Sequence, residues 1–225
     1  MKRVIECLLI LWLMCLPSFS QTVYQSSNIV GYCTLSLTGG VQNLVAPPLD
    51  NGQNTISMID SGFPNKTIIQ VWNGAGYDSS VKVAGIWSSN LSIPPGNGFF
   101  IKTPTNYNLV FFGSSPTVYH ALFPSNIFFL MGSSIPISST ISAGGPNTLN
   151  FSSFPDGTVL SVWNGTNFDS SVRLNGVWST NKMGIMEPGF AMKINGKLDP
   201  NTTLGIGQGF FIRFPSWTIW SDYIQ

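Results

Sequence analysis

Two segments of the chain, 63–90 and 154–181, have nearly the same sequence. They align without a gap at an offset of 91 positions, and 15 of the 28 aligned residues are identical. The match resumes in 96–102 against 207–213 at an offset of 111, which indicates an insertion near 182–201 in the second copy. Two copies are too few for a solenoid, and each has the size of a small domain. The alignment therefore predicts two β-repeat units, 29–114 and 115–225.

The residues from 67 to 72 alternate between two faces, as a β-strand does. Ile69 and Val71 form one face, and Gln70 at the centre of the other predicts that this second face is only partly buried. Asn73-Gly74 follows, which is a strong hairpin signal, and the second copy repeats the pattern. Gly and Pro interrupt the chain frequently, and no stretch has helical spacing. We predict an all-β fold of two tandem antiparallel β-sandwich or small β-barrel units, related by internal duplication.

The N-terminus has the three parts of a secretory leader. Met1-Lys2-Arg3 is followed by an apolar run over 4–16 and by small residues ending at Ser20. The run is too short for a membrane span, which needs about 20 apolar residues. The pattern predicts a signal peptide over 1–20, a linker over 21–28, and a secreted or cell-envelope location without a membrane span in the mature chain. A lipoprotein is the alternative, because Cys15 ends the apolar run.

Charged residues make up 8% of the chain, against roughly 25% in ordinary globular proteins. Loss of the leader would leave eight basic and eight acidic residues. Nucleic acid is therefore excluded as an expected partner, because phosphate binding depends on clustered Lys and Arg. A surface that is polar without being charged suits an extracellular or envelope protein.

Groups suited to catalysis are sparse. His120 is the single histidine, so a His-dependent triad rests on that residue alone, and Cys33 is the single cysteine after the leader. Cys33 alternates in phase with Leu35 and Leu37, which predicts a buried apolar role. The carboxylates stand singly, without a calcium-loop pattern. We predict no catalytic residue, no metal site and no cofactor.

Four residues are candidates for ligand binding. Asp78 and Asp169 occupy the same place in the two copies, after the hairpin aromatic, where an Asp more often bonds to nearby backbone. Trp217 and Trp220 have no counterpart in the first copy and are candidates for an exposed aromatic patch. The repeated tryptophans Trp72, Trp87, Trp163 and Trp178 are interpreted as core residues, with sugar stacking as the alternative.

Three strings resemble a repeat of uncharacterised exported bacterial proteins of the Verrucomicrobia type. They are Asn43-Leu44-Val45-Ala46-Pro47, then Val71-Trp72-Asn73-Gly74 with Tyr77-Asp78, then Pro95-Gly96-Asn97-Gly98-Phe99-Phe100. The resemblance covers most of 29–225 and implies a β-rich exported module, often in tandem, without an activity or functional residues to carry over. The second copy departs from the first string, with Phe129-Leu130-Met131-Gly132 in its place.

The sequence favours a non-catalytic secreted or envelope module that binds a glycan or another surface protein. A structural, self-associating envelope component is the first alternative. A glycan-active hydrolase with dispersed carboxylates is the second, because a catalytic pair can come from residues far apart in the sequence. The oligomeric state stays open.

Overall fold

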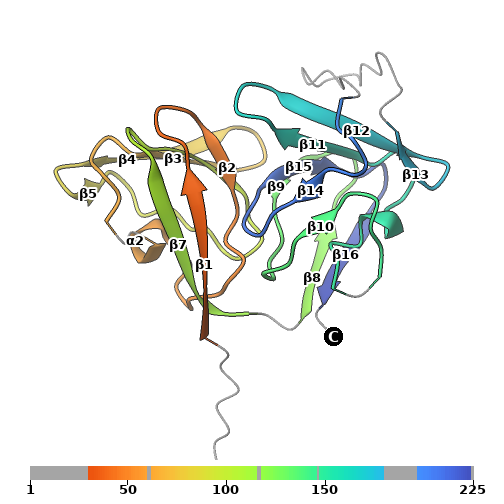
Figure 1. The fold of residues 1–225 in the computed structure, drawn as a ribbon, viewed down its shortest axis with the longest axis horizontal. Coiled ribbons are helices and arrows are strands. Elements are labelled where there is room, and N and C mark those ends of the chain that lie inside the picture. The colour runs from red at the N-terminus through yellow and green to blue at the C-terminus, as the bar shows by residue number, and fades with distance from the viewer. Residues whose placement is uncertain (1–29, 60–61, 116–117, 146, 180–196, 224–225) are drawn as a thin grey trace, which may run out of the picture.

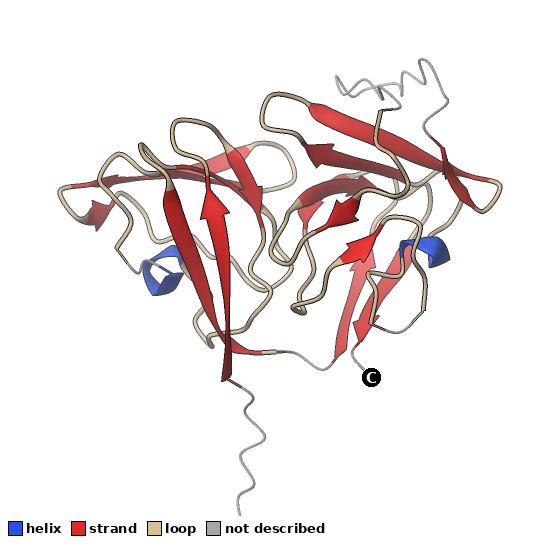
Figure 2. Cartoon of the chain, viewed as in Figure 1, coloured by secondary structure: helices blue, strands red, loops and turns tan. Residues whose placement is uncertain are grey.

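The structure, a computed structural model, describes residues 30–59, 62–115, 118–145, 147–179 and 197–223. The predicted signal peptide and linker lie outside these residues, as does most of the predicted insertion. The described part is built almost wholly of antiparallel strands, with one short α-helix and one 3-10 helix (Figure 2). The all-β prediction is confirmed. This part of the chain contains no helix with the length and apolar character needed to cross a bilayer.

Unit 1 has a five-stranded sheet with a two-stranded sheet packed across it. The larger sheet has the order β2 (Asn43–Val45), β6 (Phe99–Lys102), β3 (Ile68–Trp72), β4 (Tyr77–Val83), β5 (Ile86–Trp87). The smaller sheet pairs β1 (Val30–Leu37) with β7 (Tyr107–Ser114), and α2 (Ile56–Ile59) contributes to the same core.

Unit 2 has the same arrangement of corresponding strands. Its larger sheet has the order β9 (Phe128–Met131), β15 (Phe210–Arg213), β11 (Val159–Trp163), β12 (Phe168–Leu174), β13 (Val177–Ser179). Its smaller sheet pairs β8 (Val118–Phe123) with β16 (Thr218–Tyr223). Unit 2 also contains the short pair β10 (Ser139–Thr140) and β14 (Thr203–Leu204) and the 3-10 helix η1 (Phe151–Ser153), and both contribute residues to its core. Figure 1 shows the two units side by side, unit 1 in orange to green and unit 2 in green to blue.

Each unit buries its own core between its two sheets. In unit 1, Ile69 of the larger sheet and Leu109 of the smaller sheet are fully buried in one apolar cluster. In unit 2, Leu160 and Trp220 hold the corresponding places. Two separate sheets that face each other make a sandwich, so the structure decides between the two architectures that the sequence left open.

The turns follow from residues that accept a positive φ. Ala84-Gly85 and Asn175-Gly176 both have positive φ and form two-residue hairpins, as type I′ turns require. The predicted hairpin at Asn73-Gly74 is present, but its loop has four residues, because Trp72 pairs with Tyr77. Only the glycine has a positive φ there.

A third apolar cluster lies between the larger sheets of the two units, so the units form one body. Its buried members include Leu44 and Phe100 from unit 1 and Leu130 and Phe211 from unit 2. In unit 2 it covers the face of β11 that was predicted to be only partly buried. That prediction holds for unit 1 and is wrong for unit 2, where Ser161 is fully buried and its hydroxyl lies 2.8 Å from that of Ser170.

The contacts between the units occur in equivalent pairs. In each pair, the glycine-rich loop before the aromatic strand of one unit bonds to the first short strand of the other. The backbone bonds run from Ala46 N to Gly207 O (2.8 Å) and from Gly132 N to Gly96 O (3.0 Å), then from Gly209 N to Leu44 O (3.2 Å) and from Gly98 N to Leu130 O (2.9 Å). A two-fold relation between the units produces such reciprocity, as in the isologous interface of a symmetric dimer.

Two of the four repeated tryptophans, Trp72 and Trp163, also make equivalent contacts between the units. Trp72 of unit 1 donates its indole N–H to Phe128 O of unit 2 at 3.1 Å. Trp163 of unit 2 donates to Gln42 O of unit 1 at 2.9 Å. Their rings meet the partner unit's aromatic strand in matching pairs: Trp72 with Phe211 at 6.0 Å and Phe100 with Trp163 at 5.6 Å between ring centroids. Both tryptophans therefore join the units, and each lies partly buried at this contact rather than in the core of its own unit as interpreted from the sequence.

Candidate binding cleft between the units

Asp78 takes part in the hairpin between β3 and β4. Asn73 Nδ2 donates to Asp78 Oδ1 at 3.1 Å, while Asn73 Oδ1 accepts from the backbone N–H groups of Ala75 (3.1 Å) and Gly76 (2.8 Å). The carboxylate thus orients the asparagine that caps the loop. The corresponding contacts in unit 2 join Asn164 to Asp169, Thr166 and Asn167. Asp78 acts through the asparagine rather than on the backbone directly.

We expect Asp78→Ala to lower the free energy of unfolding by less than about 1 kcal/mol, because it removes one exposed hydrogen bond. Asp78→Asn should have a smaller effect, since its carbonyl oxygen can still accept from Asn73. Urea denaturation measures both. A loss of several kcal/mol in Asp78→Ala would show that the carboxylate does more than support the hairpin.

The two C-terminal tryptophans have opposite environments. Trp217 is 65% exposed, whereas Trp220 is 1% exposed in the core of unit 2. The indole N–H of Trp220 donates to Leu149 O at 3.3 Å. The prediction of an exposed patch is therefore wrong for Trp220, because the side chain of a strand residue three positions further on points to the opposite face. Trp217 stays on the surface beside Ile219, which is 68% exposed.

The other reactive candidates are not gathered into a site. Cys33 lies on the inward face of β1, as its phase predicts, and it is half-buried. This burial raises the pKa of its thiol, so the thiol is a poorer nucleophile at neutral pH. The side chain of His120 lies outside the described residues. Within the described ranges, no group of three or more His, Cys, Asp or Glu side chains could hold a metal ion.

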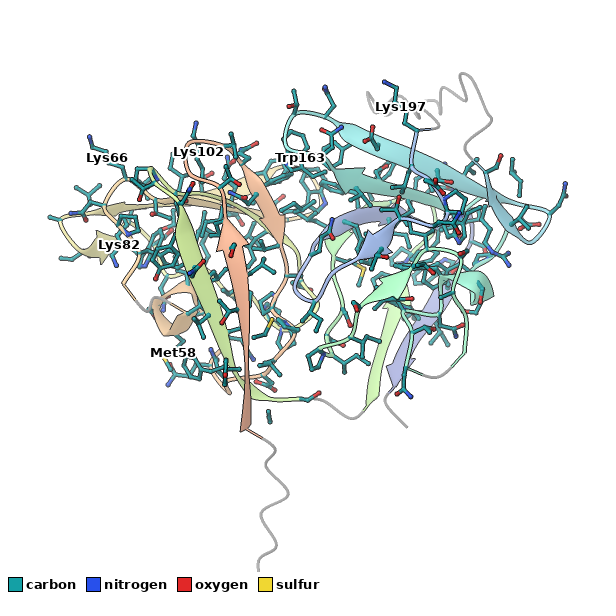
Figure 3. All side chains as sticks on the ribbon, viewed as in Figure 1. Met58, Lys66, Lys82, Lys102, Trp163 and Lys197 are labelled. Atoms are coloured by element: carbon teal, nitrogen blue, oxygen red, sulfur yellow. The ribbon has the colours of Figure 1, made fainter. Side chains whose placement is uncertain are left out.

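A cleft of about 350 Å³ opens where the two units meet. One wall comes from residues 35–38 and 41–45 of β1, β2 and their connection. The other comes from Trp163, Gly165, Gly205, Ile206 and Gln208 of unit 2. We call it the Trp163 cleft. Figure 3 shows Trp163 near the middle of the molecule, between the units. The volume is at the small end of the range for ligand pockets, which suits one or two sugar rings.

Two carboxamides in the Trp163 cleft keep half of their hydrogen-bonding capacity. Gln42 Nε2 donates to Gln70 Oε1 at 2.8 Å, and its own Oε1 has no partner among the described residues. Gln208 Oε1 accepts from Gly205 N at 3.0 Å, and its Nε2 likewise has none among them. The cleft thus offers one acceptor and one donor, each held in place by its other amide atom.

The lining of the Trp163 cleft contains no ionisable side chain. It combines an indole, carboxamides, the hydroxyls of Ser36 and Thr38, and aliphatic groups. Such a lining favours a neutral ligand with both hydroxyls and apolar faces. The indole N–H is already bonded to Gln42 O, so the ring offers only its apolar surface.

Sequence reasoning did not find Gln42 or Gln208. Gln42 stands outside the aligned segments, and only the packing of unit 2 against β2 gives it a role in a cleft. Gln208 carried a weak signal, because the aligned residue in the first copy, Asn97, is also a carboxamide. Comparison of the chain with protein-family models, with curated proteins and with solved structures finds no significant match.

Proposed function

We propose that the chain is a non-catalytic module of the cell envelope or the secreted fraction, and that it binds a neutral glycan in the Trp163 cleft. The observation that carries the proposal is the uncharged lining of that cleft, with a fixed indole and two half-used carboxamides. Hydroxyls of a sugar pair with such amide groups, and its apolar ring face packs on the indole. The leader pattern at 1–20 supports export.

Binding is favoured over hydrolysis because the cleft lining includes no Asp or Glu. Glycoside hydrolysis ordinarily needs two carboxyl groups on either side of the scissile bond. The self-association alternative is favoured by a different surface, the outer face of the β1–β7 sheet, where Tyr32 is 82% exposed opposite Phe112 at 43%. Sedimentation velocity of the sample used for glycan titration separates this alternative from a monomeric binding module.

We expect the full chain to bind cellotriose, a neutral glucose trimer, and we expect Gln42→Ala and Gln208→Ala each to weaken the affinity about 2- to 10-fold. This range is that of one lost hydrogen bond. Isothermal titration calorimetry measures the affinity. Gln53→Ala is the matched control, because Gln53 is exposed and does not line the cleft.

Backbone Gln42 O still accepts from Trp163 in the Gln42→Ala variant, so the contact between the units survives the substitution. Equal affinities in all four proteins would place the ligand elsewhere. Absence of binding to cellotriose and to a panel of other neutral oligosaccharides would refute the proposed function.

A further inference from the structure

A second cleft, of about 280 Å³, lies beside the equivalent contact between the units, where Trp72 and Gly98 meet β9. Its lining includes Trp72, Asn97, Phe129 and Met131, and we call it the Trp72 cleft. Trp72 aligns with Trp163, and Asn97 aligns with Gln208. The reciprocal contacts of the interface therefore place the same two groups, an indole and a carboxamide, in both clefts.

The two clefts differ where the copies have diverged. Asn43 and Val45 line the Trp163 cleft, and Phe129 and Met131 stand at the equivalent positions of the Trp72 cleft. Both clefts lack an ionisable side chain in their lining. Val45 and Met131 are both apolar and almost fully buried, so the clefts differ mainly by the phenyl ring of Phe129 in place of the carboxamide of Asn43.

One carboxamide remains available in the Trp72 cleft. Asn73 also lines it, but both of its amide atoms are engaged within the hairpin. The side chain of Asn97 is exposed and has no hydrogen-bond partner among the described residues. Its backbone is held against Met131 by an isolated bridge, so the side chain projects from a fixed point at the edge of the cleft.

We propose that the Trp72 cleft is a second glycan site that takes a neutral sugar bearing an acetamido substituent. This inference rests on the proposed function and names a further ligand class for it. The acetamido methyl packs against the partly buried ring of Phe129, and Asn97 Nδ2 donates to the acetamido carbonyl oxygen. A sugar without the substituent leaves the apolar wall uncovered, which disfavours it in this cleft. The chain is then bivalent, with one site for each class of sugar.

The test is calorimetric titration of the full chain with two trimers, cellotriose and tri-N-acetylchitotriose. Asn97→Ala should weaken a tri-N-acetylchitotriose site about 2- to 10-fold and leave cellotriose binding unchanged. Gln208→Ala should do the reverse, and Gln53→Ala should change neither. Saturation-transfer NMR should place the strongest signal on the acetamido methyl protons, and Asn97→Ala should reduce it.

The outcomes separate the two proposals. Cellotriose binding without a tri-N-acetylchitotriose site that responds to Asn97→Ala overturns the bivalent arrangement and leaves the proposed function standing. Loss of binding of both trimers in Gln208→Ala would also overturn the bivalent arrangement and leave the proposed function standing, because both sugars would then use the Trp163 cleft. Failure of tri-N-acetylchitotriose to bind removes the second site, and failure of both trimers and of the panel of other neutral oligosaccharides removes both proposals. Asn97 is exposed, so the variant is expected to fold, and an unchanged near-ultraviolet circular dichroism spectrum verifies this.

Discussion

Replacing Trp220 with alanine is expected to lower the free energy of unfolding by about 3–5 kcal/mol, the usual cost of deleting a fully buried indole. The ring is 1% exposed and stacks near Phe151, with 6.2 Å between the ring centroids. It also contacts the rings of Phe154 and Phe210. No single neighbour can fill the space that this removal leaves between the sheets of unit 2. A loss of this size is a large part of the 5–15 kcal/mol that holds most domains folded.

Trp217→Ala is the matched control, because it removes the same side chain from a position three residues away that is 65% exposed. We expect it to change the free energy of unfolding by no more than about 0.5 kcal/mol. Urea denaturation followed by far-ultraviolet circular dichroism measures both variants, since this signal does not depend on the deleted indole alone. Similar losses in the two variants would contradict the burial of Trp220.

The second large effect is expected at the contact between the units. Gly98→Ala should lower the free energy of unfolding by about 1–3 kcal/mol, the range for an overpacked interior. A Cβ at Gly98 would lie 2.8 Å from Leu130 Cγ and 2.9 Å from Met131 N. Because Gly98 N also donates to Leu130 O at 2.9 Å, the new methyl group must either displace β9 or break this bond.

Gly76→Ala serves as the control for Gly98→Ala, because a Cβ there meets no atom within 4 Å and its φ lies outside the left-handed region. This substitution should leave the free energy of unfolding nearly unchanged. Hydrogen exchange adds a local readout, since the amides of Gly98 and Gly132 should exchange faster in Gly98→Ala while those of β4 change less. An unaltered stability with unaltered exchange would mean that the loop and β9 are not in close contact.

The glycines of the Gly-x-Gly-Phe-Phe string show where sequence reasoning reached its limit. The string is a common feature of both copies and was found by the alignment. Its glycines, however, are explained by the other unit. A Cβ at Gly209 would lie 2.9 Å from Leu44 Cγ, just as one at Gly98 would meet Leu130. The reason for these glycines is a contact with the other unit, from Gly98 to Leu130 and from Gly209 to Leu44, which no local pattern contains.

The candidate site was predicted less well than the fold, for a related reason. Asp78 and Asp169 were candidate ligand-binding residues because both copies contain them, but they support hairpins within about five residues of themselves. Trp217 and Trp220 looked alike in the sequence and differ almost completely in exposure. Gln42 and Gln208 had no distinctive pattern, and they line one cleft only because two units meet there.

The sequence by itself determined the class of structure. Alternating residues such as Ile69 and Val71 require a strand with one apolar face. Ala84-Gly85 and Asn175-Gly176 accept the positive φ that a tight turn demands. Those are local preferences, expressed within a few residues. Only the tertiary structure decided that the units pack into one body, that Ser161 is buried while Gln70 is not, and that clefts open beside Trp72 and Trp163. These features depend on which surfaces of two folded units fit each other, and that fit is set by the summed shape of side chains far apart in the chain.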